Sequence, residues 1–165
     1  MWPERRPALG SGSVPVSTVS DSNGNYVLDG FGPGAYTVTP SKSGDVNGIA
    51  ALDASRVSQH VVGLITLNST QLMAADVSGN GSVTSFDAAQ ISQWIVLIPN
   101  ASSTGTWRFI PTSRNYANVE TAQANQNYDA ILMGEVTGNW APPAPFGMAL
   151  PSDQLWQSEI GLEVG

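Results

Sequence analysis

The sequence predicts a mixed α+β fold in which a partial β-sandwich is interrupted by a small helical insert. Residues 13–39 and the chain from residue 106 onward have the apolar alternation and Gly-rich turns of short strands. Residues 44–98 are instead rich in Ala, Ser, Gln and Val at helical spacing. Within that region, the stretch Asp53 to Leu64 matches Asp87 to Ile98 in register, which indicates a duplicated unit.

The composition is that of a folded protein and excludes several classes of function. With 165 residues, 41% of them hydrophobic, the chain can build one ordinary core or two small ones. The net charge is -7 and only six residues are Lys or Arg, so nucleic acid is not an expected partner. There is no cysteine for a disulfide or thiolate site. The longest apolar run, WIVLIP, is too short for membrane insertion, and the N-terminal MWPERRPALGSG lacks the apolar stretch of a signal peptide.

Three short strands are expected in the first β part. They are VPVSTV, YVLDGF and AYTVTP, with DSNGN and GPG as the turns between them. In the last of the three, Tyr36 and Val38 give the alternation of a half-buried strand. TWRFIP and NYDAILMGEV return to strand composition near the C-terminal end of the fold.

Helices are expected after each of two Asp-rich loops. Apolar residues recur at i, i+4 and i+7 in both copies of the repeat, as Val57, Val61 and Leu64 and as Ile91, Ile95 and Ile98. Between the copies, NSTQLMAAD predicts a short helix with Asn68 or Ser69 as its N-cap.

The second Asp-rich loop, DVSGNGSVTSFD, has oxygen-bearing side chains at alternate positions and ends in a carboxylate. Calcium takes six to eight oxygen ligands, and a twelve-residue loop supplies them from positions 1, 3, 5, 7, 9 and 12, with glycine at position 6. We therefore expect a calcium site here, with the backbone carbonyl used at position 7; its residues are Asp76, Ser78, Asn80, Ser82, Thr84 and Asp87. The alternative is an Asx-rich turn before a helix N-capped by Asp87.

The first loop, DVNGIAALD, keeps Asp45, Asn47 and Asp53 as candidate calcium ligands. The two loops start 31 residues apart (45 and 76) and close 34 apart (53 and 87), so the first lacks three residues. Ile49 would then give its carbonyl to fill the gap. A third variant of the phrase, EVTGNW at 135–140, is interpreted as a strand-end turn, with the alternative that it completes the shortened loop.

The tandem loop-helix repeat, with DVSGNGSVTSFDAA and GDVNG, resembles the dockerin family over residues 44–98. The resemblance implies an EF-hand-like loop-helix module that binds Ca²⁺, with one site in the second loop and the first loop as a candidate second site. Dockerins attach secreted bacterial proteins, commonly glycoside hydrolases, to cohesin partners. The resemblance thus implies a location outside the cell or on the bacterial cell surface.

The flanking β parts resemble a carboxypeptidase regulatory-like or Cna-B type sandwich. SDSNGNYVLDGFGPGAYTVTPSKSG carries this resemblance, together with WRFIPTSRNYANV and NQNYDAILMGEV. It implies a partial Ig-like or prealbumin-like β-sandwich, discontinuous over 13–43 and 106–140, with the 44–98 module inserted and a Pro-rich tail at 141–165. Because the first strands of the family have no counterpart, one sheet edge is expected to be open, to be filled by the tail or by another molecule.

No catalytic site is expected. His60 is the single histidine, and its partner in the repeat is Trp94, so a packing or interface role is favoured over catalysis. A glycosidase pair among Glu120, Asp129 and Glu135 is disfavoured because these acids lie in strand and turn sequence. The tryptophans are interpreted as packing residues rather than a sugar platform; those considered are Trp107, Trp140 and Trp156.

Three functional hypotheses follow. The first is a non-catalytic, calcium-stabilised module that docks to a cohesin-like domain. The second is a self-assembling surface or filament subunit, in which copies of the chain polymerise by strand exchange between the tail and the open sandwich edge. The third is an accessory region of a polysaccharide-degrading enzyme.

Overall fold

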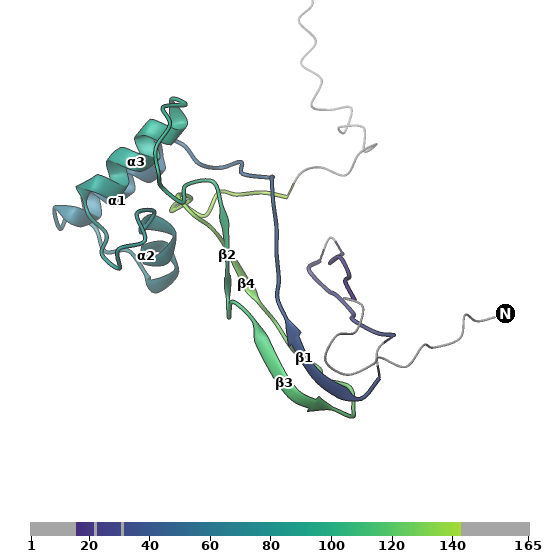
Figure 1. The fold of residues 1–165 in the computed structure, drawn as a ribbon. Helices are drawn as coiled ribbons and strands as arrows, with labels where there is room; N and C mark the ends of the chain where they lie inside the picture. Colours follow the sequence, from purple (N-terminus) through teal and green to yellow (C-terminus); the bar gives the residue numbers. More distant parts are fainter. Residues whose placement is uncertain (1–15, 22, 31, 143–165) are drawn as a thin grey trace, which may run out of the picture.

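The computed structural model describes residues 16–21, 23–30 and 32–142. Of the elements in these residues, the helices α1, α2 and α3 gather at one end, the strands β1 and β3 lie at the other, and β2 and β4 lie between them (Figure 1). The elements, in chain order, are β1 (Gly34–Val38), α1 (Ala51–Val61), α2 (Ser69–Ala75), α3 (Ser85–Ile95), β2 (Trp107–Ile110), β3 (Arg114–Val119) and β4 (Asp129–Leu132). The predicted mixed α+β class is confirmed. The strand-like segments of the tail lie outside the described residues.

The helices form where the repeat predicts them. α1 and α3 pack against each other, and the repeat-equivalent side chains Val57 and Ile91 are both fully buried. The short helix α2 begins after Asn68, whose side chain accepts a hydrogen bond from the backbone N–H of Gln71 at 2.9 Å. Of the two predicted caps, Asn68 is therefore the one used. Within the described part of the chain, no helix has the length and apolar character needed to cross a membrane.

In the described part of the chain, the strands pair in two separate antiparallel sheets of two strands each. β1 pairs with β3, with Tyr36 opposite Tyr116, and β2 pairs with β4, with Phe109 opposite Ala130. The strands expected at TWRFIP and NYDAILMGEV are thus present. The face-to-face Ig-like sandwich stays a prediction.

The prediction of strands at VPVSTV and YVLDGF was wrong for the described residues of those segments, 16–19 and 26–30, which contain no strand. Val19 is 89% exposed and Val27 is 72% exposed. Apolar alternation favours a strand only where a neighbouring strand stabilises it, and neither segment pairs with a strand in the described part of the chain, although Tyr26 packs beside Tyr128. The DSNGN turn does form, with Asp21 Oδ1 accepting hydrogen bonds from Asn23 N and Asn25 N at 2.9 Å each.

The buried core is shared between the helices and the segment around β4. Helix side chains such as Ala54, Ala74 and Ala88 form one cluster with Ile131, Met133 and Val136. The backbone joins the same parts, since Gly134 N donates to Ala74 O at 2.7 Å. The helical end and the sheet β2–β4 therefore pack as one unit.

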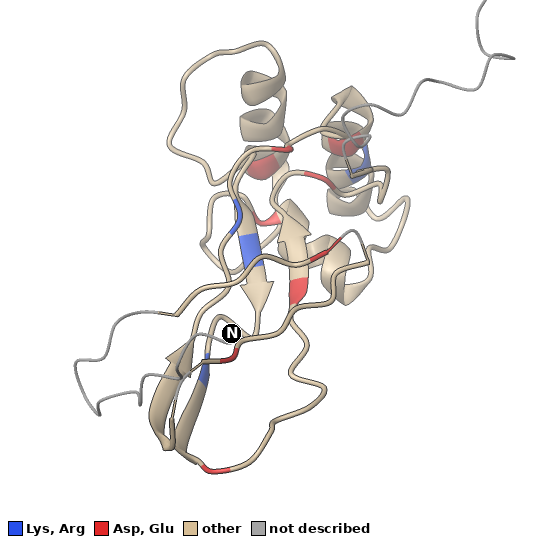
Figure 2. Cartoon of the chain, turned by 90° about the vertical axis from the view of Figure 1, so that its right-hand side faces the viewer, with Lys and Arg blue, Asp and Glu red and all other residues tan. Residues whose placement is uncertain are grey.

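Ion pairs contribute little to this core. Basic residues are few and are distributed over the helical and the strand parts, and acidic residues occur on helices, strands and loops alike (Figure 2). Among the described residues, Lys42 and Asp45 form the one ion pair, at 2.7 Å. A partly exposed pair of this kind contributes little to stability.

We expect Met133→Ala to destabilise the helices, although Met133 follows β4. Met133 is 4% exposed, and truncation of a buried Met costs about 2–5 kcal/mol. Urea unfolding followed by helical circular dichroism checks this. Leu64→Ala is the control, because Leu64 is 74% exposed and the change should stay within about 0.5 kcal/mol. Equal unfolding free energies for the two variants would contradict the shared core.

Candidate metal centres

The second loop curls around the carboxylate of Asp76, which directly follows α2. Asp76 Oδ1 accepts from Asn80 N at 3.1 Å, and Oδ2 accepts from Gly81 N at 2.9 Å. The hydroxyl of Ser78 also donates to Oδ1, at 3.3 Å. Gly81 has φ +84°, the left-handed conformation that the sharp turn at this loop position requires. The local sequence therefore gathers the oxygens of the loop in a tight turn.

The closing acid, Asp87, is fully buried. Its Oδ1 accepts from Ser78 N at 3.0 Å, and its Oδ2 accepts from Thr84 N at 2.9 Å and from the Thr84 hydroxyl at 3.0 Å. Burial acts to raise the pKa of the Asp87 carboxyl, but the hydrogen bonds from Ser78 and Thr84 together outweigh it, and the pKa lies below its ordinary value. The carboxylate is thus held charged in a buried position.

Asp87 is not the N-cap of α3, so that alternative interpretation was wrong. Thr84 is the N-cap, and its hydroxyl accepts from Phe86 N at 3.3 Å. Asp87 is the third residue of the helix. Its carboxylate accepts a hydrogen bond from the backbone N–H of Thr84, as the acidic member of a capping box.

The second loop offers oxygen donors of the kind a hard cation requires. The predicted ligands Asp76, Ser78, Asn80, Ser82 and Asp87 all stay on this one loop. Among the described residues, no three His, Cys, Asp or Glu side chains lie together as a metal site. A metal here would take hydroxyl, amide and carbonyl oxygens besides the carboxylates, which fits calcium rather than zinc.

The acids and amides of the first loop are engaged elsewhere. Asp45 pairs with Lys42. The side chain of Asn47 donates to Ala141 O at 2.9 Å and accepts from Ala141 N at 3.1 Å. Ile49 packs against the core. Neither Asp45 nor Asn47 forms a hydrogen bond to Asp53. The four residues predicted as ligands of the first loop stay a prediction: Asp45, Asn47, Ile49 and Asp53.

Asp53 is fully buried and contacts the segment that follows β4. Its Oδ2 accepts from Ala50 N at 2.8 Å, as Asp87 accepts from Thr84. Its Oδ1 accepts from Val136 N at 2.7 Å, from Thr137 N at 2.9 Å and from the Thr137 hydroxyl at 3.0 Å. Of the two interpretations of EVTGNW, these contacts favour the one that brings it to the first loop.

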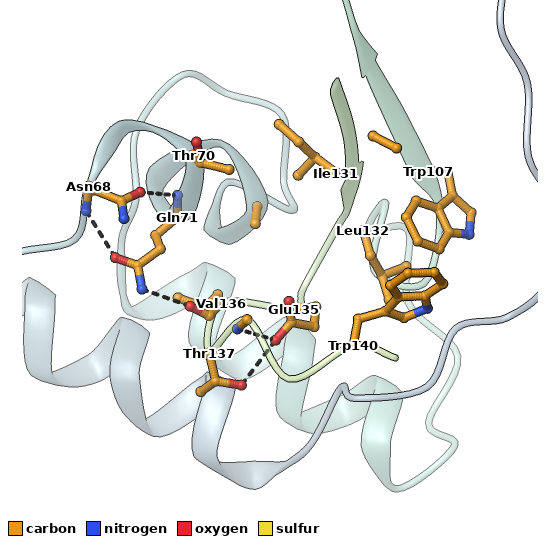
Figure 3. A pocket seen from close by; sticks show the side chains of 13 residues that line it. Asn68, Thr70, Gln71, Trp107, Ile131, Leu132, Glu135, Val136, Thr137 and Trp140 are labelled. Carbon is orange, nitrogen blue, oxygen red and sulfur yellow. Dashed lines mark hydrogen bonds between the residues drawn. The ribbon is translucent and has the colours of Figure 1, made fainter. Parts of the chain in front are cut away.

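The carboxylate of Glu135 accepts hydrogen bonds from the residues that follow it, as the carboxylate of Asp76 does in the second loop. Its Oε1 accepts from Gly138 N at 2.6 Å, from Asn139 N at 3.0 Å and from the Thr137 hydroxyl at 3.0 Å. Glu135 and Thr137 line a cavity of about 490 Å³ between α2, β4 and this turn (Figure 3). Beside the cavity, the Gln71 side chain accepts a hydrogen bond from Asn68 N and donates one to the Val136 carbonyl.

The contacts of two tryptophans agree with the packing role predicted for them. Trp107 and Trp140 meet edge to face, with ring centroids 5.2 Å apart and Lys42 beside both rings. Their indole N–H groups donate to Gly44 O at 2.8 Å and to Asp45 O at 2.7 Å. The two rings thus connect the segment between β1 and α1 to β2 and to the turn that follows β4. Trp156 lies outside the described residues.

Comparison with known proteins identifies the helical part. Residues 43–95 match the family model of the dockerin type I domain, which covers about a third of the 165 residues. No curated protein and no solved structure matches the chain. The match includes both Asp-rich loops and all three helices, so the dockerin-like prediction for this segment is confirmed. Residues 43–95 are thus similar to a dockerin type I domain, a non-catalytic module that binds calcium and cohesin partners.

Proposed function

We propose that this chain is a calcium-stabilised interaction module that docks a secreted bacterial protein to a cohesin-like partner. The observation that carries the proposal is the pair of buried carboxylates, Asp53 and Asp87, at equivalent places in the first turns of the packed helices α1 and α3 in a dockerin-like segment. A location outside the cell or on the bacterial surface belongs to the same proposal, since dockerins occur in such proteins.

Calcium would supply the counter-charge that the second loop lacks. One residue, Ser78, contacts both carboxylates of this loop, because its backbone N–H donates to Asp87 while its hydroxyl donates to Asp76. No basic side chain forms an ion pair with either acid among the described residues. Like charges in one loop repel each other unless a cation lies between them.

The helix pair presents an apolar surface for the partner. Six large apolar side chains are exposed at repeat-equivalent positions, three on each copy: Leu52, Val62 and Leu64 on one, and Phe86, Val96 and Ile98 on the other. Leu64 is 74% exposed and Val96 is 63% exposed. Clustered exposed apolar side chains mark protein interaction sites, whereas isolated ones do not. We assign partner binding to these six side chains, which lie on α1 and α3 and on the turns that follow the two helices.

Chelation of calcium is expected to lower both the melting temperature and the helical circular dichroism. A metal that binds only the native state stabilises it by about 2.7 kcal/mol when present at 100 times its Kd. Asp76→Asn should reproduce much of this loss with calcium present. Asp29→Asn, at an exposed acid outside the loops, should not. A melting curve that is the same with calcium and with chelator would contradict the proposal.

Calcium-dependent binding to a panel of cohesin modules, measured by surface plasmon resonance, tests the partner. We expect the double variant Leu64→Asp, Ile98→Asp to weaken binding at least tenfold, about 1.4 kcal/mol, because two charges enter the apolar face. Val27→Asp is the control, since Val27 is exposed far from the helices in sequence. Binding that persists in chelator, or that the double variant leaves unchanged, would count against this surface.

A further inference from the structure

We propose that the first calcium site is split along the chain. Glu135, Thr137 and Asn139 supply the oxygens of its first half, Gly48 gives a backbone carbonyl, and Asp53 closes it. Asp45 and Asn47 are not ligands. The inference rests on the proposed function, because calcium is implied by the dockerin-like segment, and it assigns a ligand set drawn partly from outside that segment.

The two halves of the second loop each have a counterpart in register. Residues 135–139 read EVTGN, against DVSGN at 76–80, with an oxygen at the first, third and fifth positions of each. Residues 48–53 correspond to 82–87, and both end in the buried aspartate. Together the two ranges match eleven of the twelve positions of the second loop, and Trp140 follows Asn139 where Gly81 follows Asn80.

Side-chain packing repeats the same correspondence. Val136 and Val77, at the second position of each half, are both 1% exposed in the core. Ile49 and Val83, at the eighth position, are both partly buried against it. Sequence similarity alone would not place four apolar side chains equivalently, so the two sites share one architecture.

Hydrogen bonding to the closing acids, Asp53 and Asp87, shows the same correspondence between the two loops. Asp53 accepts from the amide at the third position of its split loop, Thr137 N, as Asp87 accepts from Ser78 N. Each acid also accepts from its own helix N-cap, Ala50 or Thr84. Asp53 is thus oriented toward 135–139 in the way that Asp87 is oriented toward 76–80.

The side-chain amide of Asn139 points at oxygens of both segments. The atom at its end lies 3.0 Å from Gly48 O, 3.3 Å from Thr137 Oγ1 and 3.0 Å from Glu135 Oε1. These contacts are hydrogen bonds when the amide nitrogen faces the three oxygens. With the amide oxygen turned to them, four oxygens converge at the spacing of calcium ligands, which at about 2.4 Å from one ion lie about 3 Å apart.

Gly48 is the residue that lets the two segments meet. Its φ is +92°, and a Cβ there would lie 2.8 Å from Asn139 Oδ1 and 3.1 Å from the Trp140 backbone. Any larger residue would separate the segments. Asp45 meanwhile is paired with Lys42, which removes the one alternative carboxylate of the first loop from this set.

Isothermal titration of the full chain with CaCl₂ tests the assignment. We expect two ions for the unaltered protein, one for Glu135→Gln, one for Asp76→Asn, and two for the matched control Asp45→Asn. Glutamine keeps the oxygen that accepts from Gly138 N and Asn139 N, so the turn is retained while the charge is lost. Asn139→Asp should tighten one of the two sites about tenfold, since affinity rises with ligand charge.

The outcomes separate the two proposals. Loss of a site in Asp45→Asn but not in Glu135→Gln would overturn the split site in favour of the contiguous loop. One ion for the unaltered chain, lost in Asp76→Asn, would overturn the split site and leave the docking function standing. No calcium at all would refute both. Should Glu135→Gln fail to fold, an Asn139→Asp variant with both affinities unchanged still refutes the split site.

Discussion

The structure depends on two buried carboxylates that are satisfied by backbone amides. A buried charge is costly unless it is hydrogen-bonded or paired, and Asp53 and Asp87 each accept at least three hydrogen bonds. Those of Asp87 are local and shape one loop. Asp53 accepts one local hydrogen bond from Ala50, but its others come from Val136 and Thr137, more than 80 positions away, so they fix where the chain must return after β4.

That return explains the arrangement of the rest of the fold. Once Thr137 is held at the start of α1, β4 must lie against the helices, and Gly134 N reaches Ala74 O. Met133 and Val136 then complete the core of a helix pair that is otherwise poor in large side chains. The sheet β2–β4 is positioned by the same constraint, while β1 and β3 extend away at the far end (Figure 1).

Much of the helical part could be predicted because its signals are local. The repeat, the periodicity around Val57 and Ile91, and the cap at Asn68 each lie within a few residues of what they determine. The role of 135–139 could only be left as an alternative, because pairing with Asp53 depends on the fold between them. The strands expected near Val19 and Val27 failed for the converse reason: alternation is local, but a strand needs a partner.

The family match ends at residue 95, but the core extends beyond it to Ile131, Met133 and Val136. Asp53 lies within the matched segment, but its partners Val136 and Thr137 lie beyond it. The dockerin-like unit therefore depends on chain outside the match for both packing and the satisfaction of a buried charge. Calcium at the split site would strengthen the same connection between α1 and the end of β4.

Anomalous diffraction from crystals grown in calcium would test this most directly, because it locates each ion without reference to stability. The account predicts two peaks of calcium density, one among the oxygens of Asp76 and Asp87 and one among those of Glu135, Asn139 and Asp53. A single peak at the second loop, or a peak held by Asp45 and Asn47, would contradict it.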